Sequence, residues 1–143
     1  MIPLFVTNAL DDRELPLYAS TANRREWLHV DDHCRAILAV LERGRVGETY
    51  HVGSGFEASI EEIADAVLAT LGKPASLKTI VPDRPGHDWR YLLDSTKLRR
   101  ELGWAPEVEI EEGLRATVDW YRANRAWWEP LRERAPVSET AWS

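Results

Sequence analysis

The chain has 143 residues, 44% apolar and 29% charged, which is ordinary for one soluble globular domain with a hydrophobic core. Its 18 basic and 24 acidic side chains give a net charge of −6, so the usual electrostatic footprint of nucleic-acid binding is absent. The lone Cys34 excludes an internal disulfide and fits a reducing cytoplasm, and no apolar run is long enough to span a bilayer. We therefore expect a cytoplasmic protein without nucleic-acid or membrane partners.

Helix and strand patterns alternate along the chain, which predicts an α/β fold in one domain over residues 1–130. Ser59 and Glu62 form a capping box, and Asp31 or Asp32 is placed to cap another helix. Periodicity ends after Pro130, so residues 131–143 are expected to be a frayed tail. The expected elements are a helix at 3–10, strands at 15–18 and 25–30, a helix to about 42, a strand at 48–52, a helix at 60–71, strands at 77–81 and 89–93, and helices at 95–102 and 110–124.

A constrained loop between two apolar runs carries two cationic or potentially cationic side chains. In Val81-Pro-Asp-Arg-Pro-Gly-His-Asp-Trp-Arg-Tyr91, Arg84 and His87 flank a Pro-Gly pair. The proline restricts the loop, and the glycine allows a turn that other residues avoid. Because arginine offers a planar fork of donors matched to phosphate oxygens, the loop predicts an anion pocket.

Two other patterns suggest sites that simpler interpretations explain better. His29, Asp31, Asp32 and His33 would suit a metal hydrolase, but at a strand-to-helix junction these side chains diverge, and carboxylates favour the helix N-terminus. The segment 53–58 fits the G-x-G-x-x-A form of a dinucleotide fingerprint. No doubly wound set of strands follows it, so a glycine turn is the simpler interpretation. We therefore expect no metal and no cofactor bound by this chain.

Several short strings occur in an order that points to one family. The specific ones are Arg-Glu-Trp-Leu-His-Val-Asp-Asp-His at 25–33 and Asp-Arg-Pro-Gly-His-Asp at 83–88. Shorter ones are Ile-Pro-Leu-Phe at 2–5, Leu-Pro-Leu-Tyr at 15–18, Gly-Glu-Thr-Tyr-His-Val-Gly at 47–53 and Glu-Leu-Gly-Trp at 101–104. Together they resemble the C-terminal part of dTDP-glucose 4,6-dehydratases, which are extended short-chain dehydrogenase/reductases. The shorter strings recur in related epimerases, so a fragment of another NDP-sugar epimerase or dehydratase is an alternative.

The resemblance implies a small nucleotide-sugar-binding lobe without the Rossmann domain. By resemblance, Arg25, Arg84 and His87 contact the pyrophosphate, with His87 a donor in either protonation state. Arg25 could instead pair with Glu26 or Asp31 at the surface. By the same resemblance, the base and ribose are enclosed by Ile2, Pro3, Leu4, Phe5, Pro16, Leu17 and Tyr18.

Three positions depart from the family's pattern. His51 replaces an amide that contacts the nucleotide, and Ala19 and Thr21 replace glycines that precede the Arg-Glu-Trp string. If those glycines have positive φ, each substitution costs about 1 kcal/mol or reshapes the turn. These departures predict altered binding or a different nucleotide sugar.

The family's catalytic groups have no counterpart in this sequence. Family members oxidise the sugar at C4 with bound NAD, eliminate water across C5 and C6, and return hydride to C6. The Gly-rich cofactor turn, the Thr-Asp-Glu segment and the Tyr-x-x-x-Lys pair are missing, and none of the four tyrosines precedes a lysine at that spacing. Hydride transfer needs a held cofactor and a positioned acid or base. We expect no catalytic residue here and a chain that is inactive alone.

Two further expectations concern partners. A lobe separated from its cofactor domain exposes apolar surface, which predicts self-association or a companion Rossmann domain. A non-catalytic module that binds nucleotide sugars or a sister subunit is the alternative function.

Overall fold

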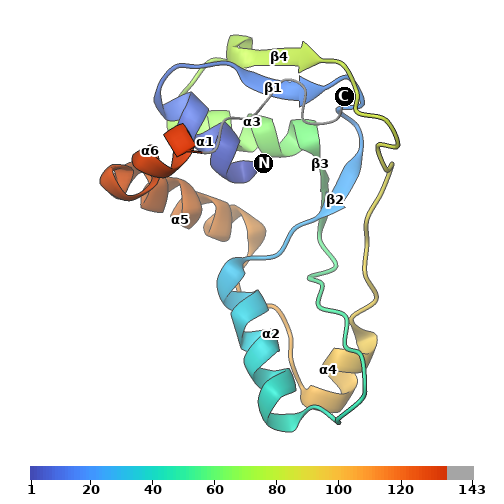
Figure 1. Cartoon of the computed structure of the whole chain (residues 1–143). Coiled ribbons are helices and arrows are strands. Elements are labelled where there is room, and N and C mark those ends of the chain that lie inside the picture. Colours follow the sequence, from blue (N-terminus) through green and yellow to red (C-terminus); the bar gives the residue numbers. More distant parts are fainter. Residues whose placement is uncertain (135–143) are drawn as a thin grey trace.

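The computed structural model describes residues 1–134 (Figure 1). As expected, it is an α/β protein. Its elements are α1 (Ile2–Leu10), β1 (Leu15–Tyr18), β2 (Arg24–Glu26), α2 (Val30–Arg43), β3 (Glu57–Ser59), α3 (Ile60–Leu71), the 3-10 helix η1 (Ala75–Leu77), β4 (Lys78–Val81), α4 (Thr96–Leu102), α5 (Ile110–Ala123) and α6 (Arg125–Arg134).

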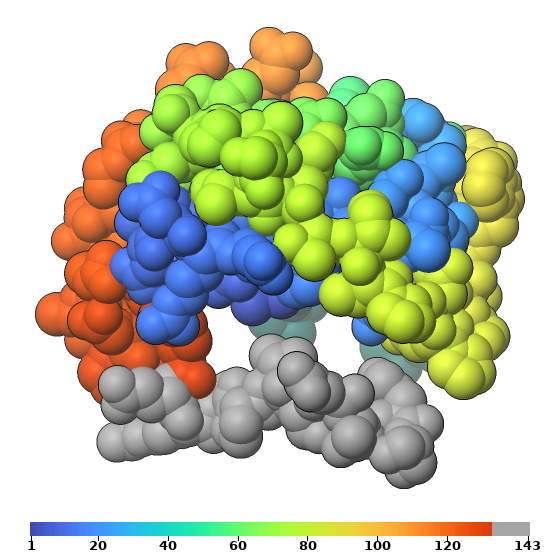
Figure 2. Space-filling model, turned by 90° about the horizontal axis from the view of Figure 1, so that it is seen from above, coloured from blue at the N-terminus to red at the C-terminus, as the bar shows by residue number. Residues whose placement is uncertain are grey.

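The main body consists of the β1–β4 pair above helices α1, α3 and α5 (Figure 1). β1 and β4 pair in parallel, with Leu17 opposite Ile80. Seen from above, the α1 and β1 region in blue lies beside the η1 and β4 region in yellow-green (Figure 2). Phe5, Leu15, Val67 and Val118 fill the core between these elements. Burial of each such side chain stabilises the fold by roughly 1.5 to 3 kcal/mol. Because Leu15 of β1 belongs to this core, the core holds β1 in place.

Helices α2 and α4 form an arm that projects from this body (Figure 1). Its core is a second cluster, with Ala36 from α2, Leu98 and Leu102 from α4, and Trp104. Asp32 is fully buried at the base of the arm. The arm is therefore held by its own small core and by this buried carboxylate.

Asp32 joins α2 to the segment that leads into α5. Its carboxylate accepts the backbone N–H groups of Glu107 and Val108, each at 3.1 Å, and is paired with Arg35. The Trp104 indole donates to the Asp32 carbonyl at 3.1 Å. Burial alone raises the pKa of Asp32, but the hydrogen bonds from Arg35, Val108 and Glu107 bring that pKa below its ordinary value.

The helix starts follow local capping chemistry. The capping box is confirmed, since Ser59 Oγ accepts the Glu62 N–H and the Glu62 carboxylate accepts the Ser59 N–H. The prediction of Asp31 or Asp32 as the cap of α2 is wrong, because His29 occupies that position and its Nδ1 accepts the Asp31 N–H. Both aspartates lie in the first turn, where carboxylates favour the helix N-terminus.

The strands expected at 48–52 and 89–93 do not form within residues 1–134. A strand needs a partner for its backbone groups, and there the second segment makes only an isolated bridge between Arg90 and Arg24. Tyr50 and Val52 do pack against the arm's core. The pattern at 48–52 therefore indicated correctly that one side of the segment packs inward. It did not show whether another strand pairs with the segment.

The C-terminal part of the described chain is more helical than expected. After α5, helix α6 passes through Pro130, where the periodicity ends, and continues to Arg134. Arg125 and Arg132 both pair with Asp11, which fastens α6 to the end of α1. Residues 135–143, the rest of the expected tail, lie outside the described residues. Across residues 1–134, no helix combines the length and apolarity required to cross a membrane.

Candidate functional site

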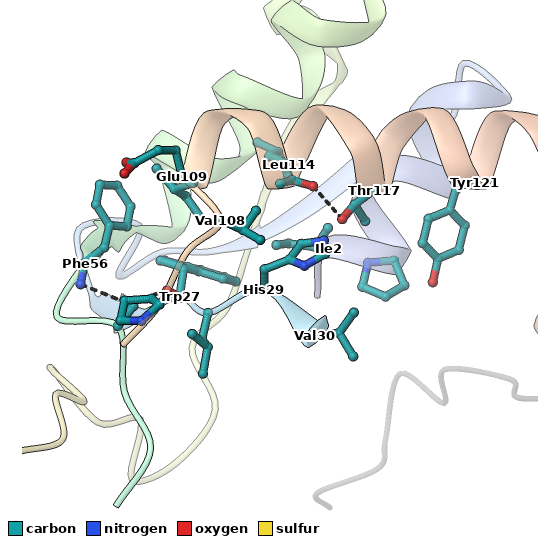
Figure 3. A pocket seen from close by; sticks show the side chains of 16 residues that line it. Ile2, Trp27, His29, Val30, Phe56, Val108, Glu109, Leu114, Thr117 and Tyr121 are labelled. Atoms are coloured by element: carbon teal, nitrogen blue, oxygen red, sulfur yellow. Dashed lines mark hydrogen bonds between the residues drawn. The ribbon is translucent and has the colours of Figure 1, made fainter. Parts of the chain in front are cut away.

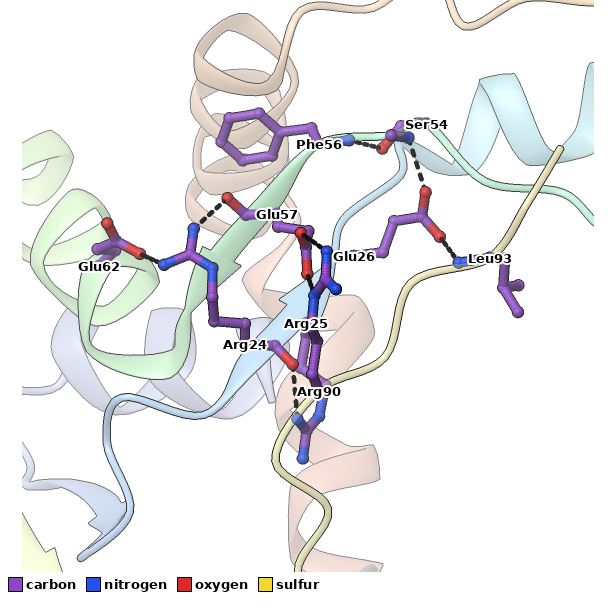
Figure 4. A network of polar contacts seen from close by, with 10 residues as sticks. Arg24, Arg25, Glu26, Ser54, Phe56, Glu57, Glu62, Arg90 and Leu93 are labelled. Atoms are coloured by element: carbon purple, nitrogen blue, oxygen red, sulfur yellow. Dashed lines mark hydrogen bonds and ion pairs between the residues drawn. The ribbon is translucent and has the colours of Figure 1, made fainter. Parts of the chain in front are cut away.

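The antiparallel pair β2–β3 and the segment after Pro82 form the frame of the candidate site (Figure 4). The Arg24 N–H donates to the Trp89 carbonyl at 2.9 Å, and the Tyr91 N–H donates to the Arg24 carbonyl at 3.3 Å. Arg90 donates twice to the Glu57 carboxylate, at 2.6 Å each. These hydrogen bonds hold residues 89–91 along β2, so Arg24 and Arg90 stabilise the segments that surround the candidate site.

Glu26 of β2 links two further segments to this pair of strands (Figure 4). Its carboxylate accepts the Gly55 N–H at 2.7 Å and the Leu93 N–H at 3.1 Å. A Cβ atom at Gly53 would lie 2.5 Å from Glu26 Oε1, so a larger residue would displace this carboxylate. Gly53 and Glu26 together fix how two distant segments face each other.

Gly53→Ala is therefore expected to lower the free energy of unfolding by about 2 kcal/mol, because the displaced Glu26 carboxylate loses its hydrogen bonds to two exposed backbone donors. Urea unfolding measures the change. The control is Gly47→Ala, where φ is +82° and no atom lies within 4 Å of the added Cβ. That variant should lose only about 1 kcal/mol of backbone strain. Equal losses in both variants would contradict the role of Glu26.

Two of the predicted pyrophosphate residues meet around Asp88. The Arg25 guanidinium donates to the Asp88 carbonyl at 2.9 Å and lies over the Tyr91 ring, 4.6 Å from its centroid. A hydrogen bond from the Tyr91 hydroxyl and the charges of Arg25 and Arg84 lower the pKa of the Asp88 carboxyl. The guanidinium of Arg84 makes no hydrogen bond to any of residues 1–134. The structure therefore brings Arg25 of β2 to the loop that carries Arg84, whose guanidinium is unpaired among residues 1–134.

His87 lies on the same loop, against Tyr18 at the end of β1. The two rings meet edge to face, with centroids 5.0 Å apart and an interplanar angle of 69°. His87 Nδ1 lies 3.0 Å from the Ser20 hydroxyl. The structure thus places Tyr18, which was expected to face the base, next to an expected pyrophosphate contact.

The residues expected to enclose the base and ribose do not share one surface. Phe5 and Leu17 are only 1% exposed and belong to the core, so they offer no surface to a ligand. Ile2 and Pro3 line a separate pocket, described next. Of the seven residues, Leu4, Pro16 and Tyr18 remain partly exposed outside that pocket. The base contact predicted for Phe5 and Leu17 is corrected accordingly, because both pack inward from α1 and β1.

Sequence reasoning missed an apolar pocket of about 400 Å³ between the body and the arm (Figure 3). Besides Ile2 and Pro3, its walls include Trp27, His29 and Tyr121. The Trp27 indole donates to the Ala58 carbonyl at 3.1 Å, which fixes the ring. The signal was present, since Trp27 and His29 alternate in the Arg-Glu-Trp-Leu-His string.

A second pocket of about 350 Å³ lies beside Arg25. Arg25, Tyr91 and Val52 are among the residues that line it, whereas Arg84 and His87 are not. His51 is exposed next to Val52 and lies near Asp94, whose pKa is lowered first by hydrogen bonds from Thr96 and also by the His51 charge. The predicted pyrophosphate residues are therefore distributed over the 82–91 loop and the adjacent strand β2.

The residues of the possible metal site and of the possible dinucleotide fingerprint have structural roles instead. His29 caps α2, and Asp32 is buried among its partners. The described residues, 1–134, contain no group of three His, Cys, Asp or Glu side chains that could hold a metal ion. The glycine turn at 53–58 leads into β3, so it lacks the direct turn-to-helix geometry of a dinucleotide fingerprint.

Comparison with known proteins decides the family. The family model described as GDP-mannose 4,6 dehydratase matches residues 1–117. The chain belongs to this family. It is 54% identical over 132 residues to the dTDP-glucose 4,6-dehydratase of Streptomyces niveus, covering 92% of this chain and 39% of that protein. It is 51% identical over 128 residues to the enzyme of Actinoplanes sp., covering 90% of this chain and 40% of that one.

Solved structures of nucleotide-sugar enzymes show the same fold. The dTDP-glucose 4,6-dehydratase of Streptomyces venezuelae, solved with NAD bound, has a TM-score of 0.88 and 55% identity over 91% of this chain and 40% of its own. The UDP-glucose 4-epimerase of Thermotoga maritima, solved with UDP-glucose, has a TM-score of 0.80 and 29% identity over 85% of this chain and 39% of its own. The chain thus spans about 40% of the length of the relatives it matches.

The family assignment confirms the resemblance to the C-terminal part of dTDP-glucose 4,6-dehydratases. It also confirms the expected fold, a lobe of an extended short-chain dehydrogenase/reductase. The two most specific strings of the sequence meet at one place, since Arg25 of the first donates to the Asp88 carbonyl of the second. The resemblance in sequence therefore corresponds to one contact in space.

Proposed function

We propose that the chain is the substrate-binding part of a dTDP-glucose 4,6-dehydratase-like enzyme. In this proposal Arg25, Arg84 and His87 bind the pyrophosphate, and Tyr18 with Pro16 lies along the nucleoside. His51 contacts the nucleotide, and Ile2 and Pro3 contribute apolar surface from the first pocket. The observation that supports it best is the meeting of Arg25 and Arg84 around Asp88. Paired guanidinium donors are suited to a diphosphate.

We also propose that turnover requires a companion domain that holds NAD. No Tyr-x-x-x-Lys pair occurs in the sequence, and a relative more than twice this length was solved with NAD. On this proposal the chain alone binds nucleotide sugar but does not convert it. A lobe of this kind also needs a surface on which the companion can dock.

The outer face of α2 fits that docking role. Val30, Ile37, Leu38 and Leu41 form a stripe at helical spacing and are between 52% and 79% exposed. The opposite side of the same helix, with Ala36 and Val40, packs in the arm's core. A helix that is apolar on two sides is typical of one buried on both, so we propose that the companion covers this stripe.

Calorimetric titration of the chain with dTDP-glucose, NAD and zinc tests these assignments. Binding of dTDP-glucose without NAD supports the proposed function, and binding of zinc alone would favour the metal hydrolase. If dTDP-glucose binds but no activity returns on mixing with the N-terminal, NAD-binding part of a relative, the chain is a non-catalytic nucleotide-sugar module. Absence of any dTDP-glucose binding would overturn the proposal.

Arg84→Ala is expected to weaken dTDP-glucose binding by about 1.5 to 3 kcal/mol, because one charge-assisted pair with the diphosphate is lost. The thermal midpoint should stay nearly unchanged, since this guanidinium makes no hydrogen bond to any of residues 1–134. Titration and thermal unfolding measure the two effects. Arg115→Ala, which removes the same charge from α5, is the control and should change neither. A large loss of stability with unchanged affinity would show that Arg84 is structural.

A further inference from the structure

The hydroxyl of Ser20 is engaged in three side-chain hydrogen bonds. Its Oγ lies 2.6 Å from Asp83 Oδ1, 3.0 Å from Asn23 Nδ2 and 3.0 Å from His87 Nδ1. A serine hydroxyl has one hydrogen to donate and two lone pairs that accept. Three partners therefore use its full capacity, and each role can be assigned.

Asp83 determines the direction of the network. Hydrogen bonds from the Ser20 hydroxyl and from the Ser20 N–H, the latter at 3.1 Å, hold the pKa of the Asp83 carboxyl below its ordinary value. An ionised carboxylate only accepts, so the Ser20 hydrogen points to Asp83. The Asn23 amide donates to one lone pair of Ser20. The remaining lone pair faces His87 Nδ1, which must therefore carry a hydrogen.

The carboxylate of Asp83 strengthens this assignment. Its Oδ1 lies 3.5 Å from His87 Nδ1, where an N–H is attracted and a ring lone pair is repelled. The other ring nitrogen, Nε2, has no hydrogen-bond partner among residues 1–134. The His87 side chain is 8% exposed. Because Nδ1 is engaged by Ser20 and Asp83, Nε2 is the ring nitrogen that a ligand would contact.

We infer that Ser20 is a positioning residue that commits one proton to Nδ1 of His87 and so makes phosphate binding at Nε2 depend on a second proton. In the neutral ring Nε2 is an acceptor, which repels a phosphate oxygen. In the imidazolium it is a charged donor. This inference differs from the expectation that His87 donates in either protonation state. The inference rests on the proposed function, because the ligand is the pyrophosphate of a nucleotide sugar.

The carboxyls and the lysine near this loop whose pKa values are shifted keep their charge between about pH 5.5 and about pH 8.5. Hydrogen bonds lower the pKa of three carboxyls, Asp83 through Ser20, Asp88 through Tyr91, and Glu61 through Lys78. A hydrogen bond to Asp65 raises the pKa of Lys78. Tyr18 of β1 and Asp83 contact His87, and Arg84 and Asp88 lie on its own loop. Arg25 of β2 donates to the Asp88 carbonyl, and Glu61, which is paired with Lys78, accepts from Thr21.

Titration of the full chain with dTDP-glucose across that range tests the inference. This probe is suitable because its pyrophosphate is esterified at both ends and does not titrate there. Wild-type affinity should fall by about tenfold or more as pH rises, since a charge-assisted hydrogen bond is lost. His87→Gln, whose amide donates at every pH, should give a flat profile. Ser20→Ala should flatten the profile, whereas Ser20→Thr, which keeps the hydroxyl, should preserve it.

Nitrogen-15 NMR of the ring nitrogens reads the tautomer without any ligand. The chain has four histidines, and loss of one signal in His87→Gln assigns the ring. Neutral His87 should show hydrogen on Nδ1 in the wild type and on Nε2 to a larger extent in Ser20→Ala. Hydrogen on Nε2 in the wild type, or a flat wild-type profile with binding intact, would overturn the inference alone. Failure to bind at every pH would overturn the proposed function, and the proton linkage with it.

Discussion

Asp32→Ala is expected to lower the free energy of unfolding by about 3 kcal/mol, which is among the largest effects of any single substitution in this chain. The side chain is fully buried and accepts the N–H groups of Glu107 and Val108. Its removal leaves both donors unpaired and leaves Arg35 without its buried partner. Because these contacts join α2 to the segment before α5, the arm should loosen from the body.

Urea unfolding of Asp32→Ala and of Asp31→Ala measures this effect with a matched control. Asp31 is the neighbouring carboxylate in the same helical turn, but its side chain is 77% exposed and only 3.7 Å from His29 Nδ1. Its removal should cost less than about 1 kcal/mol, through the helix N-terminus alone. Similar losses in the two variants would show that the buried contacts do not stabilise the arm.

The same carboxylate makes stability depend on acid. Hydrogen bonds from Arg35, Val108 and Glu107 outweigh burial and lower the pKa of Asp32 in the folded chain. Stability from a lowered carboxyl pKa is present above the unfolded value of about 3.9 and is lost as pH falls through the folded value. The stability difference between wild type and Asp32→Asn should therefore shrink below about pH 4. A constant difference down to about pH 2 would contradict this contribution.

Local chemistry explains which parts of the fold were predictable. The Ser59 and Glu62 capping box is complete within four consecutive residues, so the start of α3 was found. The 48–52 strand was wrong because pairing needs a distant partner, which periodicity does not report. The cap of α2 was missed because His29 uses a ring nitrogen where an aspartate was expected.

The candidate site was only partly predictable for the same reason. Arg25 and Arg84 were predicted because each lies within a string specific to the dehydratases, and the charges of both lower the pKa of Asp88. The role of Ser20 was not visible, because its partners Asp83 and His87 follow more than sixty residues later. The burial of Phe5 and Leu17 was also invisible, since apolar residues beside a ligand and in a core look alike in sequence.

Replacing Leu38 and Leu41 by aspartate is expected to weaken docking of a companion domain by more than about 100-fold, because each leucine contributes roughly 1.5 to 3 kcal/mol when buried. Both side chains lie on the exposed stripe of α2 and leave the arm's core intact. The measurement is dTDP-glucose turnover after mixing the chain with the N-terminal, NAD-binding part of a relative. Affinity of the chain alone for dTDP-glucose should not change, since the stripe is separate from the Arg84 loop.

Leu131→Asp is the control, because it makes the same type of substitution once at an exposed leucine of α6 and should leave turnover unchanged. Sedimentation of the wild-type chain shows whether a second copy of the chain, rather than a companion domain, covers the stripe. A dimer that dissociates in the Leu38→Asp, Leu41→Asp variant would show that a second copy covers α2. A wild-type chain that is a well-behaved monomer and regains no activity with the companion would contradict both, because a solvent-facing apolar stripe on a helix already packed on its other side would then have no partner.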